Sequence, residues 1–76
     1  MNQITLLEAA YRRKVFFTAE HFAAARAVQR RMTVVEKADE AVRLARLGAA
    51  LLQVLDQDEK ELVEIRRKIR ELKVSR

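Results

Sequence analysis

Apolar residues recur along the first part of the chain with the spacing of an amphipathic helix. Between residues 4 and 32 they are mostly three, four or seven positions apart, which places them on one side of an α-helix. Thr5 followed by Glu8 has the sequence of a capping box, which opens many helices. We therefore predict a helix over residues 4–31. Its apolar stripe consists of Ile4, Leu7, Tyr11, Val15, Phe22, Ala25, Val28 and Met32.

One segment of this helix allows an alternative. Val15, Phe16 and Phe17 have low helix preference, and they precede Thr18, a residue type that caps helices. The chain could therefore bend or break at this point. If the helix is continuous instead, Phe16 lies on the polar side and stays exposed.

The rest of the chain has the pattern of a second, longer helix. Thr33 and Glu36 form another capping-box sequence, so we predict a turn near residue 33 and a helix over residues 34–74. No glycine, proline or asparagine marks this turn, which leaves a helix running through position 33 as an alternative. From residue 41 the steps alternate between three and four, as in a coiled-coil seam. The seam runs through Ala41, Leu44, Gly48, Leu51, Leu55, Asp58, Leu62, Ile65, Ile69 and Leu72.

Two positions decide whether this second helix is interrupted. Gly48 could end a helix, or it could lie inside one where two backbones approach closely; the heptad pattern passes through it and favours the second interpretation. Asp56 and Glu59 could open a new helix. The predicted fold is thus one all-α domain, residues 1–76, built as a helical hairpin of two helices, or three if the chain breaks near residue 56.

The length of the chain predicts an oligomer. A chain of 76 residues buries little surface by itself, so its free energy of folding is marginal. A helix of about 40 residues would extend about 60 Å and overhang the shorter first helix, leaving its end to be covered by another chain. We expect a dimeric helical bundle, or a larger protein partner, held through the coiled-coil seam. The predicted interface residues are Leu44, Leu51, Leu55, Leu62, Ile65, Ile69 and Leu72.

The net charge of +5 brings nucleic acid into consideration. Arginine suits phosphate because its planar guanidinium donates two hydrogen bonds at once. In the C-terminal basic run, acidic residues within a few positions weaken the field, so the N-terminal face is the better candidate. The predicted phosphate contacts are Arg12, Arg13, Lys14, Arg26, Arg30 and Arg31. A membrane-surface helix is disfavoured, because core packing explains the same apolar stripe.

Catalysis and cofactors find no support in the sequence. There is no cysteine, His21 is the only histidine, and Ser75 is the only serine, so neither a transition-metal set nor an activated nucleophile is indicated. The acidic residues between 56 and 64 alternate with basic ones four positions away and predict a solvated, self-compensating helix face. We predict no enzyme activity, no metal and no cofactor. No basic segment followed by an apolar run opens the chain, which predicts a cytoplasmic protein.

These observations lead to two functional hypotheses. The first is a non-enzymatic helical protein–protein interaction module of the adaptor, chaperone or inhibitor type, acting through its apolar heptad seam. The alternative is a dimeric nucleic-acid-binding or regulatory protein that contacts phosphates through the N-terminal arginine-rich face.

Overall fold

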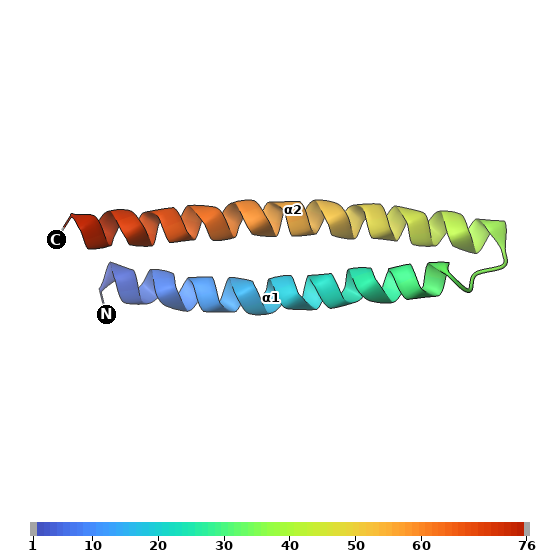
Figure 1. The fold of residues 1–76 in the computed structure, drawn as a ribbon, viewed down its shortest axis with the longest axis horizontal. Helices are drawn as coiled ribbons and strands as arrows, with labels where there is room; N and C mark the ends of the chain where they lie inside the picture. The colour runs from blue at the N-terminus through green and yellow to red at the C-terminus, as the bar shows by residue number, and fades with distance from the viewer. Residues whose placement is uncertain (1, 76) are drawn as a thin grey trace.

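The protein is a hairpin of two long helices, as a computed structural model of residues 2–75 shows (Figure 1). Helix α1 spans Gln3–Met32 and helix α2 spans Ala38–Val74, and residues 33–37 connect them. The helices lie side by side and antiparallel in a rod of 59 × 15 × 14 Å. The predicted hairpin is therefore confirmed. The three-helix alternative and the helix running through position 33 are both wrong.

The helix ends differ from the predicted capping boxes. Asn2 caps α1, and its Oδ1 accepts a hydrogen bond from the backbone amide of Thr5 at 2.8 Å. Thr33 ends α1 instead of starting α2, because its hydroxyl donates backwards to the carbonyl oxygen of Arg30 at 2.7 Å. Helix α2 begins after Lys37, which gives no side-chain cap, and carries Asp39 and Glu40 in its first turn. Carboxylates at this end favour the helix because they face its partial positive charge.

Helix α1 passes without a break through the segment that allowed one. Thr18 does not cap a new helix, because its hydroxyl donates to the carbonyl oxygen of Lys14 at 2.7 Å inside the same helix. Phe16 is 61% exposed, as expected for a continuous helix. Its ring packs edge-on against that of Phe17, with 5.8 Å between the centroids.

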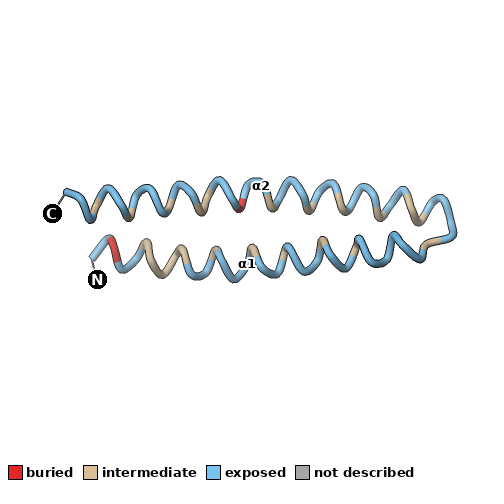
Figure 2. Tube along the Cα trace, viewed as in Figure 1, coloured by how far each residue is buried: buried red, intermediate tan, exposed pale blue. Residues whose placement is uncertain are grey.

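Both helices, and not only α2, contribute a heptad seam to the hairpin. Half-buried residues recur along the facing edges of the two helices in Figure 2. On α1 these positions follow a strict alternation of three- and four-residue steps, which keeps them on one side over many turns. They are Ile4, Leu7, Tyr11, Lys14, Thr18, His21, Ala25 and Val28.

The predicted stripe of α1 is therefore wrong in its middle. Val15 and Phe22 were assigned to it because they are apolar, yet they are 44% and 54% exposed. The positions one residue earlier, Lys14 and His21, face α2 instead. Residues reached by two successive steps of four move gradually around the helix, so Val15 leaves the side that packs against α2. The position in the heptad therefore decides which side chains face α2, even where those side chains are polar.

Gly48 lies in the interior of α2 and faces α1, as the heptad predicted. A Cβ atom built on Gly48 would lie 3.6 Å from Cγ1 of Val28, an ordinary van der Waals distance. The helices therefore pass close together here, with room left for a methyl group.

Most of the C-terminal part of α2 is covered by α1, and its last turn extends past the start of α1 by less than the predicted overhang (Figure 1). Ile4 and Leu72 line the same small pocket at the open end of the hairpin. The helices are more nearly matched than predicted, with 30 and 37 residues, because α2 begins only at Ala38. Within residues 2–75, neither helix contains a segment long and apolar enough to cross a membrane.

The hairpin has almost no closed core. Among the described hydrophobic residues only Ile4 is buried, and the other apolar seam residues are half-buried. Two helices have a single line of contact, so each seam side chain keeps an open flank. Large apolar side chains consequently remain on the surface, Leu6, Phe17, Phe22, Leu47 and Leu52 among them.

Candidate interaction surface

A cluster of charged side chains interrupts the apolar seam halfway along the hairpin. Asp58 is 2% exposed, and both of its carboxylate oxygens are engaged from α1. Lys14 Nζ lies 2.7 Å from Oδ1, and His21 Nδ1 donates to Oδ2 at 2.7 Å. Lys14 also reaches Glu61, at 2.6 Å from its Oε2. We call Lys14, His21, Asp58 and Glu61 the polar layer.

The polar layer favours the charged forms of Lys14, Asp58 and Glu61. The pKa of the Asp58 carboxyl is lowered, first by the hydrogen bond from Lys14 and then by the one from His21. The pKa of Lys14 is raised by the same contact with Asp58 and by a second contact with Glu61. No buried side-chain nitrogen or oxygen atom among residues 2–75 lacks a hydrogen-bond partner. The buried charge is therefore fully compensated, as a buried carboxylate requires.

The polar layer contains two residues of the acidic run that was predicted to form a solvated helix face, Asp58 and Glu61. Asp58 belongs to the acidic run predicted to be solvated, but it points into the seam. The prediction is confirmed for Asp56, whose carboxylate lies 3.2 Å from Lys60 Nζ on the exposed face, whereas Glu61 reaches Lys14 of the other helix and Glu64 pairs with Arg67. Within the described residues, no cluster of histidine or carboxylate side chains is arranged to hold a metal ion.

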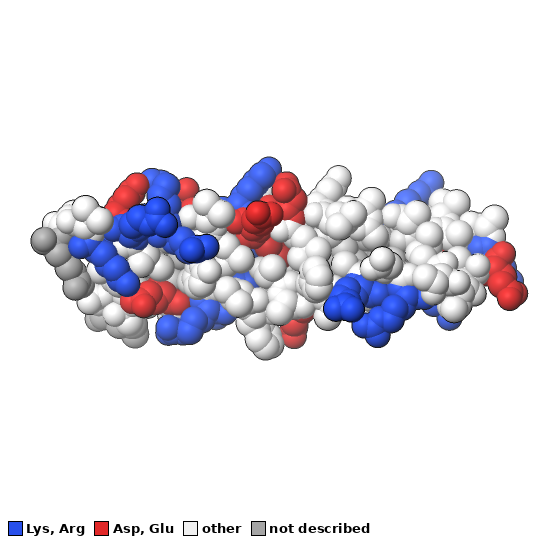
Figure 3. Space-filling view, in the orientation of Figure 1, with Lys and Arg blue, Asp and Glu red and all other residues white. Residues whose placement is uncertain are grey.

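An apolar groove runs along one edge of the hairpin, in the half nearer the turn. It has a volume of about 530 Å³, and uncharged surface covers much of this half in Figure 3. Its bottom is formed by half-buried seam residues, Gly48 among them. Phe22, Met32 and Leu52 are exposed around it. The full lining is Phe22, Ala25, Arg26, Val28, Gln29, Met32, Leu44, Ala45, Gly48, Ala49, Leu52 and Leu55.

The predicted interface residues of α2 all lie in the half-buried seam against α1. Leu44 and Leu55 also line the apolar groove, so a part of their surface faces outwards. Ile69 and Leu72 line pockets near the open end. Leu51, Leu62 and Ile65 line none of these three pockets. The sequence pattern thus located the seam, but it assigned Phe22 to the packed stripe and did not single out Leu52, and both are exposed beside the seam.

The predicted phosphate contacts do not form one face. Lys14 is inside the seam, held by two carboxylates. Arg31 pairs with Glu40 across the turn end, with its Nη2 2.9 Å from Oε1. Arg26 lines the apolar groove. Arg13 and Arg30, which lie towards opposite ends of α1, are exposed.

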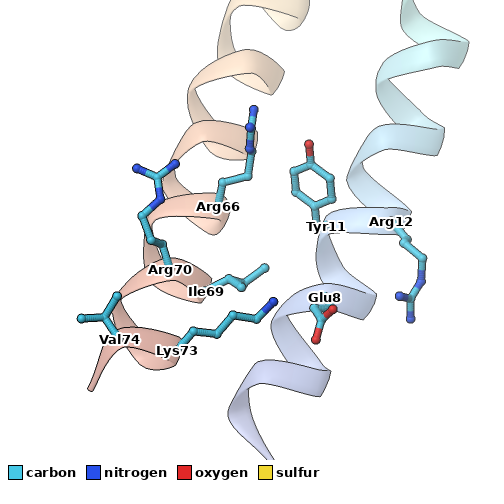
Figure 4. Close-up of a pocket in the computed structure, with 8 residues that line it drawn as sticks. All are labelled: Glu8, Tyr11, Arg12, Arg66, Ile69, Arg70, Lys73 and Val74. Carbon is cyan, nitrogen blue, oxygen red and sulfur yellow. The ribbon is translucent and has the colours of Figure 1, made fainter. Parts of the chain in front are cut away.

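The sixth residue of that set, Arg12, lies in a different cluster at the open end of the hairpin. Here a second groove of about 530 Å³ is lined by both helices, and basic atoms gather at this end in Figure 3. Figure 4 shows its lining. We call it the cationic groove, and its lining is Glu8, Tyr11, Arg12, Arg66, Ile69, Arg70, Lys73 and Val74.

Sequence reasoning discounted the C-terminal arginines because acidic residues surround them. The structure divides these arginines into two groups. Arg67 takes both nearby carboxylates, pairing with Glu64 and with Glu71. Arg66 and Arg70 form no ion pair with any residue in the described part of the chain. The helical periodicity contains this signal, since residues 66, 70 and 73 share one side of a helix.

The two grooves lie on the same edge of the hairpin. Adding 14 to residues 8, 11 and 12 of the cationic groove gives residues 22, 25 and 26 of the apolar groove. Subtracting 21 from residues 66, 69, 70 and 73 gives residues 45, 48, 49 and 52. These shifts are whole heptads, so the corresponding residues face the same way. One edge of the hairpin is therefore apolar near the turn and cationic near the chain ends. Comparisons with known protein families, with curated proteins and with solved structures found no match to this chain.

Proposed function

We propose that the protein is a non-enzymatic helical interaction module that binds another protein through its apolar groove. The observation that carries this proposal is that the hairpin has a thin core and leaves large apolar side chains exposed around a groove. Only one hydrophobic residue is buried among those described, while Phe22 is 54% and Leu52 is 65% exposed. Contiguous apolar surface of this kind marks interaction sites. An adaptor, a chaperone and an inhibitor would all use such a groove in the same way, by accepting a helix of the partner protein in it.

The partner that fits this groove is a second copy of the same chain. Large side chains, Phe22 and Leu52, stand beside small ones, Ala45, Gly48 and Ala49, on one edge. A two-fold axis through the groove places the large residues of each copy opposite the small residues of the other, which is what a self-complementary interface needs. The product is a four-helix bundle, in which the two hairpins give each other the core that each one lacks.

The charge on this edge determines how far the two copies overlap. A full-length antiparallel overlap would bury the cations of one cationic groove against the apolar groove of the other copy, leaving unpaired charges out of water. An overlap limited to the turn halves avoids this cost. The open ends, with their cationic grooves, then project from opposite ends of the dimer.

The test is the mass of the protein in solution, measured by light scattering after size exclusion over a range of concentrations. We expect the wild-type chain at twice its 8.8 kDa mass. Phe22→Ser combined with Leu52→Ser removes the large residues of the groove and should give the monomer. Phe16→Ser is the matched control, because Phe16 is equally exposed on α1 but does not line the groove.

The outcomes separate a specific interface from general stickiness. A control variant that stays dimeric while the groove variant dissociates supports the proposal. A wild-type chain that is monomeric throughout overturns the second copy as partner. Equal dissociation of both variants, with helix content preserved in circular dichroism, shows that the groove is not the interface.

A further inference from the structure

We infer that the cationic groove is a binding site for phosphoryl groups. This inference goes beyond the proposed dimer, because the groove lies at the other end of the hairpin from the apolar groove. Its lining contains four cations, Arg12, Arg66, Arg70 and Lys73, against one carboxylate, Glu8. The excess of three positive charges is concentrated on a surface that both helices build.

The four cations are not neutralised by the protein itself. None of them forms an ion pair with another residue of the described chain. Other basic residues do so readily: Arg67 takes two carboxylates, and Lys14 takes two more. The groove therefore carries an excess of positive charge that the protein leaves uncompensated, and a bound anion would neutralise it.

The donors present match the chemistry of phosphate. Figure 4 shows Arg66 and Tyr11 extending from opposite helices into the space between them. A guanidinium donates two parallel hydrogen bonds to phosphate oxygens, and a phenol hydroxyl adds a third. Three of the cations lie along one side of α2, from residue 66 to residue 73, over about 10 Å of helix. A ligand with more than one phosphoryl group can contact them in succession.

The single carboxylate indicates where in the groove the ligand lies. Glu8 comes from the N-terminal turns of α1 and shares its end of the groove with Lys73 in Figure 4. The opposite end, with Arg66 and the Tyr11 hydroxyl, has no carboxylate in the lining. We therefore place the first phosphoryl group at Arg66 and Tyr11.

Adjacent arginines provide the test. Arg66→Gln and Arg67→Gln change the net charge equally and differ by one position, but only Arg66 lines the cationic groove. Tripolyphosphate is titrated into the 15N-labelled protein at about 150 mM salt, and the Kd is obtained from backbone amide shifts. We expect the wild-type shifts to centre on Tyr11, Arg66 and Arg70. Arg66→Gln should raise the Kd about tenfold, and Arg67→Gln less than about twofold.

A second arm distinguishes a free oligophosphate from the phosphodiesters of a nucleic acid. The anisotropy of a labelled single-stranded oligonucleotide is measured with the same variants across a salt series. If nucleic acid supplies the phosphoryl groups, Arg66→Gln reduces the slope of log K against log salt by about one, and Arg67→Gln leaves it unchanged. If the oligonucleotide does not bind while tripolyphosphate does, the source is a small oligophosphate.

Two results would overturn the inference. One is the absence of localised amide shifts in the wild-type protein with either probe. The other is an equal loss of affinity in the two variants, since this would show that only the net charge matters. Neither result depends on the mass of the protein in solution, so failure of this site and failure of the proposed dimer are distinguishable.

Discussion

Lys14 and Asp58 belong to different helices, yet Lys14 Nζ lies 2.7 Å from the Asp58 Oδ1 in the middle of an otherwise apolar seam. An ion pair at such a position costs desolvation energy, and replacing both partners with apolar residues is often neutral or favourable for stability. The ion pair instead fixes how the two helices are aligned along each other. If either helix slides by a heptad, Leu7 or Val28 takes the place of one of the two α1 partners of Asp58, Lys14 or His21, so only one alignment of the hairpin gives both carboxylate oxygens a partner.

Asp58→Asn should lower the free energy of unfolding by about 2 kcal/mol, because it removes the anion that compensates a half-buried lysine. Urea unfolding followed by circular dichroism measures this value. Asp56→Asn is the matched control, since Asp56 pairs with Lys60 on the exposed face. Its cost should stay within about 0.5 kcal/mol. Equal effects of the two substitutions would contradict the buried role of Asp58.

The contribution of Asp58 should depend on pH in a defined direction. Its pKa is lowered in the folded state, mainly by Lys14. Stability from the carboxylate is therefore fully present above the pKa of the unfolded chain, about 4, and is lost as the pH falls through the lower folded pKa. The stability difference between the protein and its Asp58→Asn variant should be constant from about pH 5.5 to 8 and shrink in acid.

His21 also faces Asp58, so this comparison is made in a His21→Gln background, which leaves Lys14 and Glu61 as the charged groups around the carboxylate. A difference that grows below about pH 4 would contradict the lowered pKa of Asp58. At the alkaline end, the pKa of Lys14 is raised in the folded state, so its contribution is fully present below the pKa of the unfolded lysine, about 10.5, and is lost as the pH rises through the higher folded value.

Double-mutant cycles should separate the buried pair from an exposed one. For Lys14→Met with Asp58→Asn we expect a coupling energy above about 1 kcal/mol, because both groups lose water on folding. For Arg43→Met with Asp39→Asn the coupling should be below about 0.5 kcal/mol, because this pair, at 3.5 Å, lies in solvent. Unfolding by urea at low and high salt gives both values. Similar coupling energies for the two pairs would mean that Lys14 and Asp58 are hydrated.

Gly48→Ala should raise the free energy of unfolding by about 0.8 kcal/mol, because alanine has a higher helix propensity and a less flexible unfolded state than glycine. The new methyl group has room, at 3.6 Å from Val28 Cγ1. A thermal or urea melt measures the change, and Ala50→Gly, at an exposed position of the same helix outside the groove, should show a loss of similar size. Destabilisation by Gly48→Ala would mean that the helices are closer together than in this structure.

The sequence alone determined the helical character of the chain and favoured the hairpin, and the structure excluded the continuous-helix and three-helix alternatives. Alanine, leucine and charged residues without proline leave no other fold class, and the three- and four-residue steps from Ala41 to Leu72 identified the side of α2 that packs. Gly48 was placed inside that helix for the same reason. Local chemistry was less informative: Thr33 has the sequence of a cap for either neighbouring helix, and only the tertiary structure shows that it ends α1.

The tertiary structure alone decided which polar residues are buried. On α1 the apolar character of Val15 and Phe22 pointed to the wrong stripe, since a lysine and a histidine become favourable seam residues only when an aspartate of the other helix lies opposite them. The cationic groove likewise joins Arg12 to Arg66, which are 54 positions apart in the chain. Periodicity reports the faces of one helix at a time. Ion pairs and grooves between helices depend on their relative register, which is set by contacts between residues distant in sequence.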